Sequence, residues 1–292
     1  MCYRGLSLLL LLLTALGAAV CQQQPQQQPQ AGPTPGISQS AAATDGGASS
    51  APFGASSEPS GQFGLAASIG SPAGEPRLQF QGTATVAYSP DPLTPYQAVG
   101  LGCGLGFVSP TFQTNYVGVS SEYFDDAQAC GRCITLQCDD QSCAEPGKEL
   151  PALVVDVCGS CSGSDLSIAI PLFKNLTGRE AGSNPSIVVS WDLISCAPYT
   201  VGTIKMLVKA GGSAFFQAFG FSNYVVPIAQ VQVNGTRLQQ GSDGFYSYNP
   251  GSPIDPSAPL AVALLGANRE VLRATVPSLR SADLGFQFTP QA

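Results

Sequence analysis

Short hydrophobic runs separated by turn residues fill the chain from Leu78 to Cys196. The runs ATVAY, CITLQC, ALVVDV and SIVVSW have the length and β-branched content of strands, and Gly, Pro, Asn or Ser fall between them. The one helix-like segment is short, at about residues 168–176. Short strands of this kind, together with cysteines, predict a small β-barrel over residues 78–197.

After Cys196 the same pattern continues without cysteines. The runs TIKMLVKA, AFFQAFGFS, IAQVQVN, LAVALLG and REVLRATV alternate with Gly- and Pro-rich turns, and no internal repeat is visible. Regularly spaced short strands predict a β-sandwich of immunoglobulin-like size, about 90–100 residues. We assign it to residues 198–292, which makes the whole fold all-β.

The chain before Leu78 has a different pattern. Residues 1–21 contain one Arg and an apolar run too short to span a bilayer, which is typical of a secretory signal peptide. Residues 22–77 are rich in Gln, Pro, Gly and Ser and predict a disordered spacer. No later segment approaches about 20 uninterrupted apolar residues. We therefore expect a secreted, soluble protein without a membrane span.

Secretion changes the interpretation of the cysteines and of two Asn residues. Eight cysteines follow the predicted leader, and an even number in an oxidising compartment predicts disulfides. Asn175 and Asn234 begin Asn-x-Thr sequons, which predict N-glycosylation and a surface location. The eight cysteines are Cys103, Cys130, Cys133, Cys138, Cys143, Cys158, Cys161 and Cys196.

The chain contains no histidine, which excludes His-based triads, His-ligated zinc and imidazole acid–base chemistry. Its net charge is −7 and only 11% of its residues are charged, so it has no basic stripe for nucleic acid. We attribute the acidity to solubility. Nothing in the sequence calls for a metal, a nucleotide or another cofactor.

The segment VVDVCGSCSGSDLSIAI, residues 154–170, combines a Cys-x-x-Cys with two aspartates. Cys158 and Cys161 are compatible with a redox motif, with a zinc site shared with Cys130 and Cys133, or with a local disulfide. The all-β context and the oxidising compartment favour the disulfide. Asp156 and Asp165 can face one groove from either side of this loop; alternatively, each caps a turn or a helix.

Several segments between Leu78 and Phe288, taken in order, resemble the expansin family, whose barrel resembles that of the family-45 endoglucanases. The resemblance implies a six-stranded double-psi β-barrel followed by an immunoglobulin-like, carbohydrate-binding β-sandwich. The matching segments are Gly82–Tyr88, Gly102–Gly106, Cys130–Cys133 with Cys138, Val155–Asp156, Asp165–Ser167 with Phe173, and Val188–Trp191 with Cys196.

The resemblance also implies how the cysteines pair. Expansins join the Gly-Cys-Gly cysteine to the first cysteine of Cys-Gly-x-Cys, and the second to the last cysteine of the barrel. A third disulfide closes a short segment of the chain, and one pair of cysteines is left for the loop between the two aspartates. The implied pairs are Cys103–Cys130, Cys133–Cys196, Cys138–Cys143 and Cys158–Cys161.

In expansins, a first-strand Thr, a strand-end Asp and a second Asp line the polysaccharide groove. Thr85, Asp156 and Asp165 match these positions, with Tyr88 as an aromatic neighbour. The chain departs from the family at Gly163 and Ser164, which replace a His and a Phe, and at Cys158, which replaces an aromatic residue.

The catalytic base of the related endoglucanases lies on the first strand, where this chain has no acidic residue before Asp91. Inverting hydrolysis needs two carboxyl groups roughly 6.5–9.5 Å apart. We therefore assign no catalytic residue firmly and retain Asp165 as an acid-like candidate.

Aromatic residues of the predicted sandwich are the second candidate binding surface. Expansins carry a pair of aromatics here and a third on a later strand, and the matching positions are Phe215, Phe216 and one of Phe245, Tyr246 or Tyr248. Planar rings suit the apolar faces of sugars. The alternative is core packing, which we expect for Phe219 and Phe221. Trp191, the single Trp, is assigned to the core or a domain interface, with the groove as the alternative.

The resulting hypothesis is a secreted, monomeric protein that binds cellulose, another β-glucan or hemicellulose in the cell wall and loosens it without hydrolysis. The first rival is a family-45-like endoglucanase with Asp165 as acid and Asp91 or Asp156 as base. The second rival is a non-catalytic structural or signalling protein of the wall.

Overall fold

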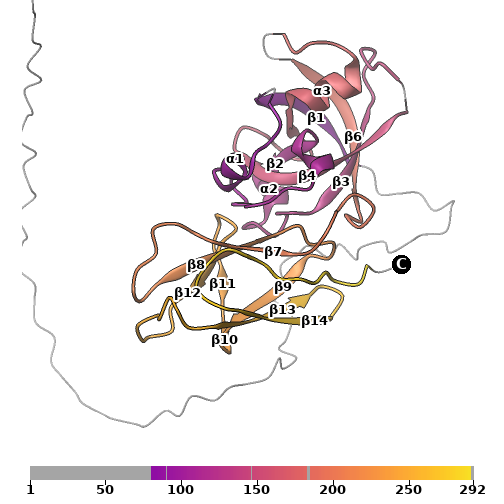
Figure 1. Ribbon diagram of the computed structural model, residues 1–292. Coiled ribbons are helices and arrows are strands. Elements are labelled where there is room, and N and C mark those ends of the chain that lie inside the picture. Colours follow the sequence, from indigo (N-terminus) through magenta and orange to yellow (C-terminus); the bar gives the residue numbers. More distant parts are fainter. Residues whose placement is uncertain (1–79, 90, 146, 183–184, 291–292) are drawn as a thin grey trace, which may run out of the picture. The chain divides into compact units, whose positions relative to one another are not determined.

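The computed structural model describes residues 80–89, 91–145, 147–182 and 185–290 of the 292-residue chain (Figure 1). The predicted leader, residues 1–21, and the predicted spacer, residues 22–77, lie outside the described residues. None of the helices within the described ranges is both long and apolar enough to cross a membrane.

Six strands close into a barrel in the order β1-β5-β2-β4-β3-β6. Two neighbouring pairs are parallel, β1 with β5 and β2 with β4, and the others are antiparallel. The predicted six-stranded barrel is therefore confirmed. Its strands are β1 (Phe80–Tyr88), β2 (Tyr116–Ser120), β3 (Cys133–Cys138), β4 (Glu149–Cys158), β5 (Leu166–Ala169) and β6 (Ser186–Ile194).

Short helical segments join the barrel strands: α1 (Pro95–Val99), η1 (Pro110–Gln113), α2 (Ser121–Phe124) and α3 (Ile170–Thr177). The predicted helix at about residues 168–176 corresponds to α3, but its first two residues belong to β5. Pro171 lies in the first turn of α3 and Gly178 caps its end with a φ of 68°. Hydrogen bonding to β1 and β2 keeps Leu166–Ala169 extended.

Two further sheets form a β-sandwich, as predicted. One sheet has the order β10-β9-β13-β14 and the other β11-β12-β8-β7-β15. Phe219, Val231, Val262 and Phe288 are buried in the core between them. The strands are β7 (Lys205–Val208), β8 (Gln217–Ser222), β9 (Ile228–Val233), β10 (Thr236–Arg237), β11 (Gln239–Gln240), β12 (Tyr246–Tyr248), β13 (Leu260–Gly266), β14 (Val271–Val276) and β15 (Ala282–Asp283).

The predicted boundary between residues 197 and 198 falls in the connection from β6 to β7. The position of this boundary stays a prediction. The barrel has its own buried core, which includes Phe112, Tyr116, Phe173 and Ile134.

All four predicted disulfides are present and all lie in the barrel. They join Cys103 to Cys130, Cys133 to Cys196, Cys138 to Cys143 and Cys158 to Cys161. The widest of them, between Cys133 and Cys196, bridges a separation of 63 residues and ties the start of β3 to the end of the barrel segment. The Cys-x-x-Cys at residues 158–161 is therefore a local disulfide, as predicted.

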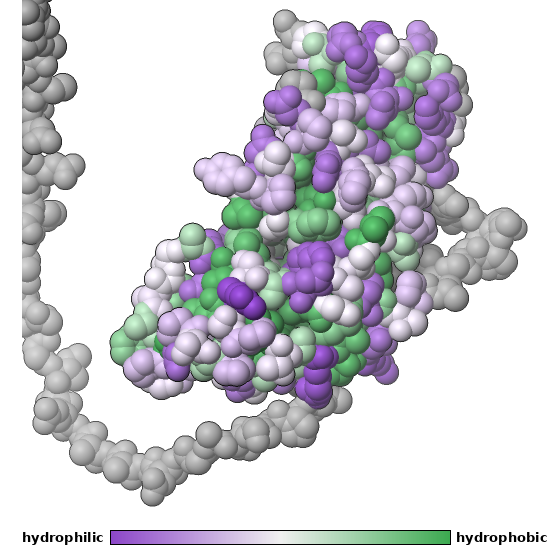
Figure 2. Space-filling model, in the orientation of Figure 1, coloured by the Kyte–Doolittle hydropathy of each residue, from purple (hydrophilic) through white to green (hydrophobic). Residues whose placement is uncertain are grey.

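Large hydrophobic side chains are rarely exposed among the described residues, and hydrophobic and hydrophilic side chains are interspersed on the face in Figure 2. Asn175 and Asn234 are both exposed, as their sequons require, while their glycosylation stays a prediction. The exposed large hydrophobic residues are Tyr96, Val188, Val201, Phe215, Phe216 and Val271.

Candidate functional site

Asp156, near the end of β4, is held by three protein donors. The backbone N–H groups of Gly102 and Val157 donate to its Oδ1 over 2.7 and 2.9 Å. The Tyr88 hydroxyl donates to its Oδ2 over 3.3 Å. Both carboxylate oxygens are thus engaged within the barrel, and the carboxylate anchors the loop at Gly102 to the end of β4.

Tyr88, at the end of β1, is the centre of this polar cluster. Its hydroxyl lies 2.9 Å from Ser167 Oγ as well as next to Asp156. Burial, as the largest effect, raises the pKa of Tyr88 well above its usual value, so the phenol stays protonated and remains a donor. The hydroxyl thus faces Asp156 and Ser167, and the predicted contact of Tyr88 with polysaccharide stays a prediction.

Two glycines and Ser167 were missed as parts of the site by sequence reasoning. A Cβ atom on Gly118 would lie 2.4 Å from the Tyr88 hydroxyl and 2.5 Å from Ser167 Oγ, so the cluster leaves room for hydrogen alone. A Cβ atom on Gly102 would lie 2.7 Å from Asp156 Oδ1. The only sequence signal for Gly118 is its position within the otherwise bulky run YVGVS.

Asp165 lies at the start of β5 and has different partners. The backbone N–H of Thr83 donates to its Oδ1 over 2.8 Å, and Ser162 Oγ donates to its Oδ2 over 3.3 Å. Thr85 lies two residues beyond Thr83 on the same exposed face of β1, in register with Ser167 of β5. Asp165, Thr83 and Thr85 therefore form a polar edge where β1 meets β5.

Asp156 and Asp165 flank the Cys158–Cys161 disulfide loop, but no hydrogen-bond partner among the described residues joins them. A common groove for both carboxylates stays a prediction. The loop itself is anchored by three hydrogen bonds: from Ser120 Oγ to the Gly163 carbonyl oxygen over 2.6 Å, from Trp191 Nε1 to the Ser164 carbonyl oxygen over 2.8 Å, and between Tyr123 and Ser164 over 3.3 Å.

The surroundings of Asp165 bear on the rival endoglucanase hypothesis. Among the described residues, no second carboxylate shares a hydrogen-bond partner with Asp165. The nearest acidic residue after β1, Asp91, contributes with burial, the larger effect, to a raised pKa of Tyr116, so its charge acts on that phenol. Within the described ranges, no group of three or more His, Cys, Asp or Glu side chains could hold a metal ion.

Phe215 and Phe216 lie in the turn that precedes β8. Their exposed fractions are 54% and 42%, in agreement with the predicted surface role. The run AFFQAFGFS was predicted to be a strand, but β8 begins only at Gln217, so both rings precede the strand. The turn is held by hydrogen bonds from Ser213 N–H to the Phe216 carbonyl oxygen and from Ile254 N–H to the Ala214 carbonyl oxygen, at 2.8 and 2.7 Å.

The prediction that one of Phe245, Tyr246 or Tyr248 joins Phe215 and Phe216 on an exposed binding surface is wrong. The exposed fractions of these three residues are only 3%, 8% and 4%. Tyr246 and Tyr248 belong to the sandwich core. Phe245 packs against Gly104, where a Cβ atom would lie 2.1 Å from the ring, and under Lys209, whose Nζ is 4.5 Å from the ring centroid.

Two other predictions about aromatic residues of the chain are confirmed. Phe219 and Phe221 belong to the sandwich core, with exposed fractions of 0% and 4%. Trp191 is a core residue of the barrel, with an exposed fraction of 3%.

Comparisons with known proteins support the same family. No protein-family model matches the chain. Expansin-A13 of Arabidopsis thaliana is 28% identical over 160 residues, which cover 49% of this chain and 58% of that protein. The chain thus matches less than two thirds of the length of this curated relative.

Two crystal structures of the expansin of Clavibacter michiganensis resemble this fold. The apo form has a TM-score of 0.55 and a mutant in complex with cellohexaose has a TM-score of 0.57. Each is 21% identical to this chain and covers 73% of it and 99% of the expansin. The resemblance of this chain to the expansin family is therefore confirmed, in sequence over part of its length and in fold over both the barrel and the sandwich.

Proposed function

We propose that this protein is a secreted, expansin-like protein that binds cell-wall polysaccharide and loosens it without hydrolysis. The observation that carries the proposal is the pair of exposed rings, Phe215 and Phe216, on a hydrogen-bonded turn of the sandwich. Exposed aromatic rings of this kind stack on the apolar faces of sugar rings. A related expansin fold has been crystallised with cellohexaose, which makes a β-glucan chain the first ligand to test.

The polar edge of the barrel supplies the second part of the proposed surface. Thr85 and Asp165 are accessible to sugar hydroxyl groups where β1 meets β5. Asp156 acts in this proposal through the geometry of its loop, because its oxygens already accept three hydrogen bonds. Two modules that bind one polymer raise the effective concentration of each other, which favours retention on a bundled substrate.

A non-hydrolytic mechanism is supported by the surroundings of Asp165. General acid catalysis of glycoside cleavage needs a second carboxylate to activate water, and β1 carries none. We infer that the protein separates neighbouring polysaccharide chains without bond cleavage. Its contacts with one chain replace the hydrogen bonds of that chain to its neighbours. The apolar leader and the disulfides support secretion to the cell wall, where we expect the protein to act as a monomer.

The test is a pull-down on insoluble cellulose, xylan, mannan, pectin and chitin with the full chain. Replacing both exposed rings, as Phe215→Ala/Phe216→Ala, should weaken binding to the preferred polysaccharide by about tenfold or more, since each aromatic contact is worth about 0.5–1.5 kcal/mol beyond its buried area. Tyr96→Ala is the matched control, because this ring is 91% exposed but lies on α1, outside the proposed surface.

A sugar-release assay on the same material separates the rival functions. Loosening of wall material without new reducing ends is the expected result. Release of reducing ends that Asp165→Asn abolishes would make the protein a glucanase. Binding without any mechanical effect on the wall would favour the structural or signalling role.

A further inference from the structure

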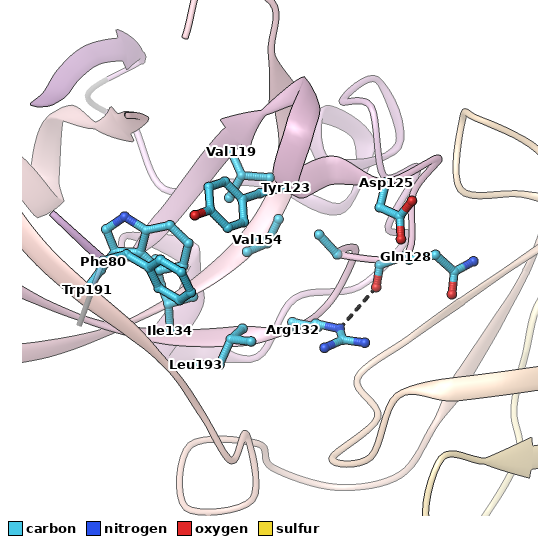
Figure 3. Close-up of a pocket in the computed structure, with 11 residues that line it drawn as sticks. Phe80, Val119, Tyr123, Asp125, Gln128, Arg132, Ile134, Val154, Trp191 and Leu193 are labelled. Atoms are coloured by element: carbon cyan, nitrogen blue, oxygen red, sulfur yellow. Dashed lines mark hydrogen bonds between the residues drawn. The ribbon is translucent and has the colours of Figure 1, made fainter. Parts of the chain in front are cut away.

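A pocket in the barrel lies on the other side of Tyr123 and Trp191, the two rings that anchor the Asp165 loop at Ser164; it contains neither Asp156 nor Asp165. Its space, counted together with open solvent at the mouth, is about 470 Å³. Side chains from β1, β2, β3, β4 and β6 line it together with the segment that follows β2 (Figure 3). Hydrophobic residues make up most of its wall, and three polar side chains, Asp125, Gln128 and Arg132, complete it. The pocket is therefore amphipathic, with a long apolar wall and a small polar part.

Three aromatic rings form one part of the wall. Phe80 stacks on Trp191 with ring centroids 4.5 Å apart and an interplanar angle of 30°. Tyr123 meets both rings edge-on, at 5.2 Å from Phe80 and 5.3 Å from Trp191. The Trp191 N–H is already satisfied by the Ser164 carbonyl oxygen. Apart from the Tyr123 hydroxyl, which lies 3.3 Å from Ser164 Oγ, this part of the wall is ring carbon and aliphatic side chain and offers few partners to sugar hydroxyl groups.

Arg132 supplies the positive charge of the polar part. Its Nε donates to the Gln128 carbonyl oxygen over 3.1 Å, and among the described residues it forms no ion pair. Partial burial lowers the pKa of this guanidinium, with Tyr224 and Asp125 acting in the opposite direction, so its charge is poorly solvated. The two terminal NH₂ groups have no acceptor among the described residues and can take a planar, two-oxygen group.

The backbone that positions Arg132 is strained. Asp125, Asp126 and Ala127 are consecutive non-glycine residues with φ angles of 45°, 47° and 71°. Such left-handed residues normally occur singly, and strain of this kind is concentrated at ligand clamps and active sites. The turn is closed by a hydrogen bond from Gln128 N–H to the Asp125 carbonyl oxygen, and the Gln128 carbonyl oxygen then accepts from Arg132.

We propose that this pocket binds a small planar aromatic carboxylate, with its ring against Phe80, Tyr123 and Trp191 and its carboxylate on Arg132. Aromatic rings favour edge and face contacts with another ring over contacts with an aliphatic chain. A carboxylate matches the free NH₂ groups of the guanidinium. Asp125 is exposed at the same pocket and opposes an anion only weakly, because water screens its charge. Its polar group, Arg132, does not belong to the proposed polysaccharide surface.

Benzoate and its neutral analogue benzamide are suitable probes, because they differ in charge and hardly in shape. Trp191 is the only Trp in the chain, so its fluorescence reports the pocket directly in the full-length protein. Benzoate should change this fluorescence saturably and bind about tenfold more tightly than benzamide. Arg132→Gln should remove that preference, whereas Asp125→Asn should increase benzoate affinity about twofold by removing a like charge.

Arg237→Gln is the matched control, because this arginine is exposed on β10 and lies outside the pocket. It should leave both affinities unchanged. Calorimetry of the same titrations guards against optical artefacts, and circular dichroism checks that each variant is folded. Absence of a saturable response to both probes would overturn the pocket as a ligand site. Equal affinities for benzoate and benzamide, or a preference that survives in folded Arg132→Gln, would overturn the role of Arg132.

Discussion

The barrel and the sandwich are stabilised by different features. The barrel carries all four disulfides and a partly buried polar cluster around Tyr88, and its candidate groups lie on β1, near the end of β4 and in the disulfide-closed loop before β5. The sequence after residue 197 contains no cysteine, and the sandwich depends on an apolar core that includes Phe219 and Phe288. Its exposed rings occupy a turn at the edge of that core. The barrel loops are thus restrained by disulfides and polar contacts, whereas the turn that carries Phe215 and Phe216 is held by backbone hydrogen bonds beside an apolar core.

The largest test of this difference is removal of the Cys133–Cys196 disulfide. Cys133→Ala/Cys196→Ala should lower the free energy of unfolding of the barrel by about 4 kcal/mol, because the disulfide restrains a long loop in the unfolded chain. Urea titration followed by Trp191 fluorescence measures this change. Cys158→Ala/Cys161→Ala is the control, with a loss of about 1.5 kcal/mol for a separation of three residues. Equal losses for the two pairs would contradict this account.

A smaller change should disrupt the polar cluster alone. Gly118→Ala places a methyl group against the Tyr88 hydroxyl and Ser167 Oγ, and we expect a loss of about 2 kcal/mol in the stability of the barrel. Gly159→Ala is the matched control, because an added Cβ atom meets nothing within 4 Å there. Urea unfolding curves of both variants provide the measurement, and the control should change by less than about 0.5 kcal/mol. If both variants behave alike, the cluster is not tightly packed.

Removing one hydroxyl from the cluster should have a still smaller effect. Tyr88→Phe deletes the donor to Asp156 and should lower the free energy of unfolding by about 1 kcal/mol. Tyr116→Phe is the control: its ring is 5.3 Å from that of Tyr88, but no hydrogen bond from its hydroxyl to the described residues is found. Polysaccharide binding should also weaken in Tyr88→Phe if Asp156 positions its loop for the ligand. Unchanged stability and binding would show that the backbone donors are sufficient.

The smallest effect concerns acid sensitivity of the sandwich. Hydrogen bonds from Lys205 and Thr203, with that from Gly285 N–H, lower the pKa of Asp283 to about 2. A folded pKa below the unfolded value of about 3.9 stabilises the protein above pH 4, and this stabilisation is lost as the pH falls towards 2. Thermal melting of Asp283→Asn should therefore depend less on pH between 4 and 2 than melting of the wild type. The difference should shrink in high salt, because this carboxylate is exposed. The same pH dependence of the melting temperature in both proteins would contradict this prediction.

Strand positions and the pairing of cysteines could be predicted from the sequence, whereas several side-chain environments could not. The hydrophobic run at residues 168–176 predicted a helix, but pairing with β1 and β2 extends its first residues as β5. Phe245 and Phe215 are both aromatic residues beside turns in the sequence, yet the Phe245 ring packs against Gly104 and the Phe215 ring is exposed. Local sequence cannot distinguish them, because the space that accepts Phe245 is made by a glycine more than a hundred residues away.

Apolar runs of strand length, separated by turn residues, determined the all-β architecture, and the absence of His excluded imidazole chemistry without any structure. Cysteine pairing followed from family resemblance and was confirmed by geometry. Only the tertiary structure distinguished the environments of the two aspartates, because their hydrogen-bond partners come from distant strands and loops. These partners are Tyr88 and Gly102 for Asp156, and Thr83 for Asp165. Barrel closure alone brought Phe80 and Trp191 into one pocket with Arg132, because it joins residues from both ends of the barrel sequence.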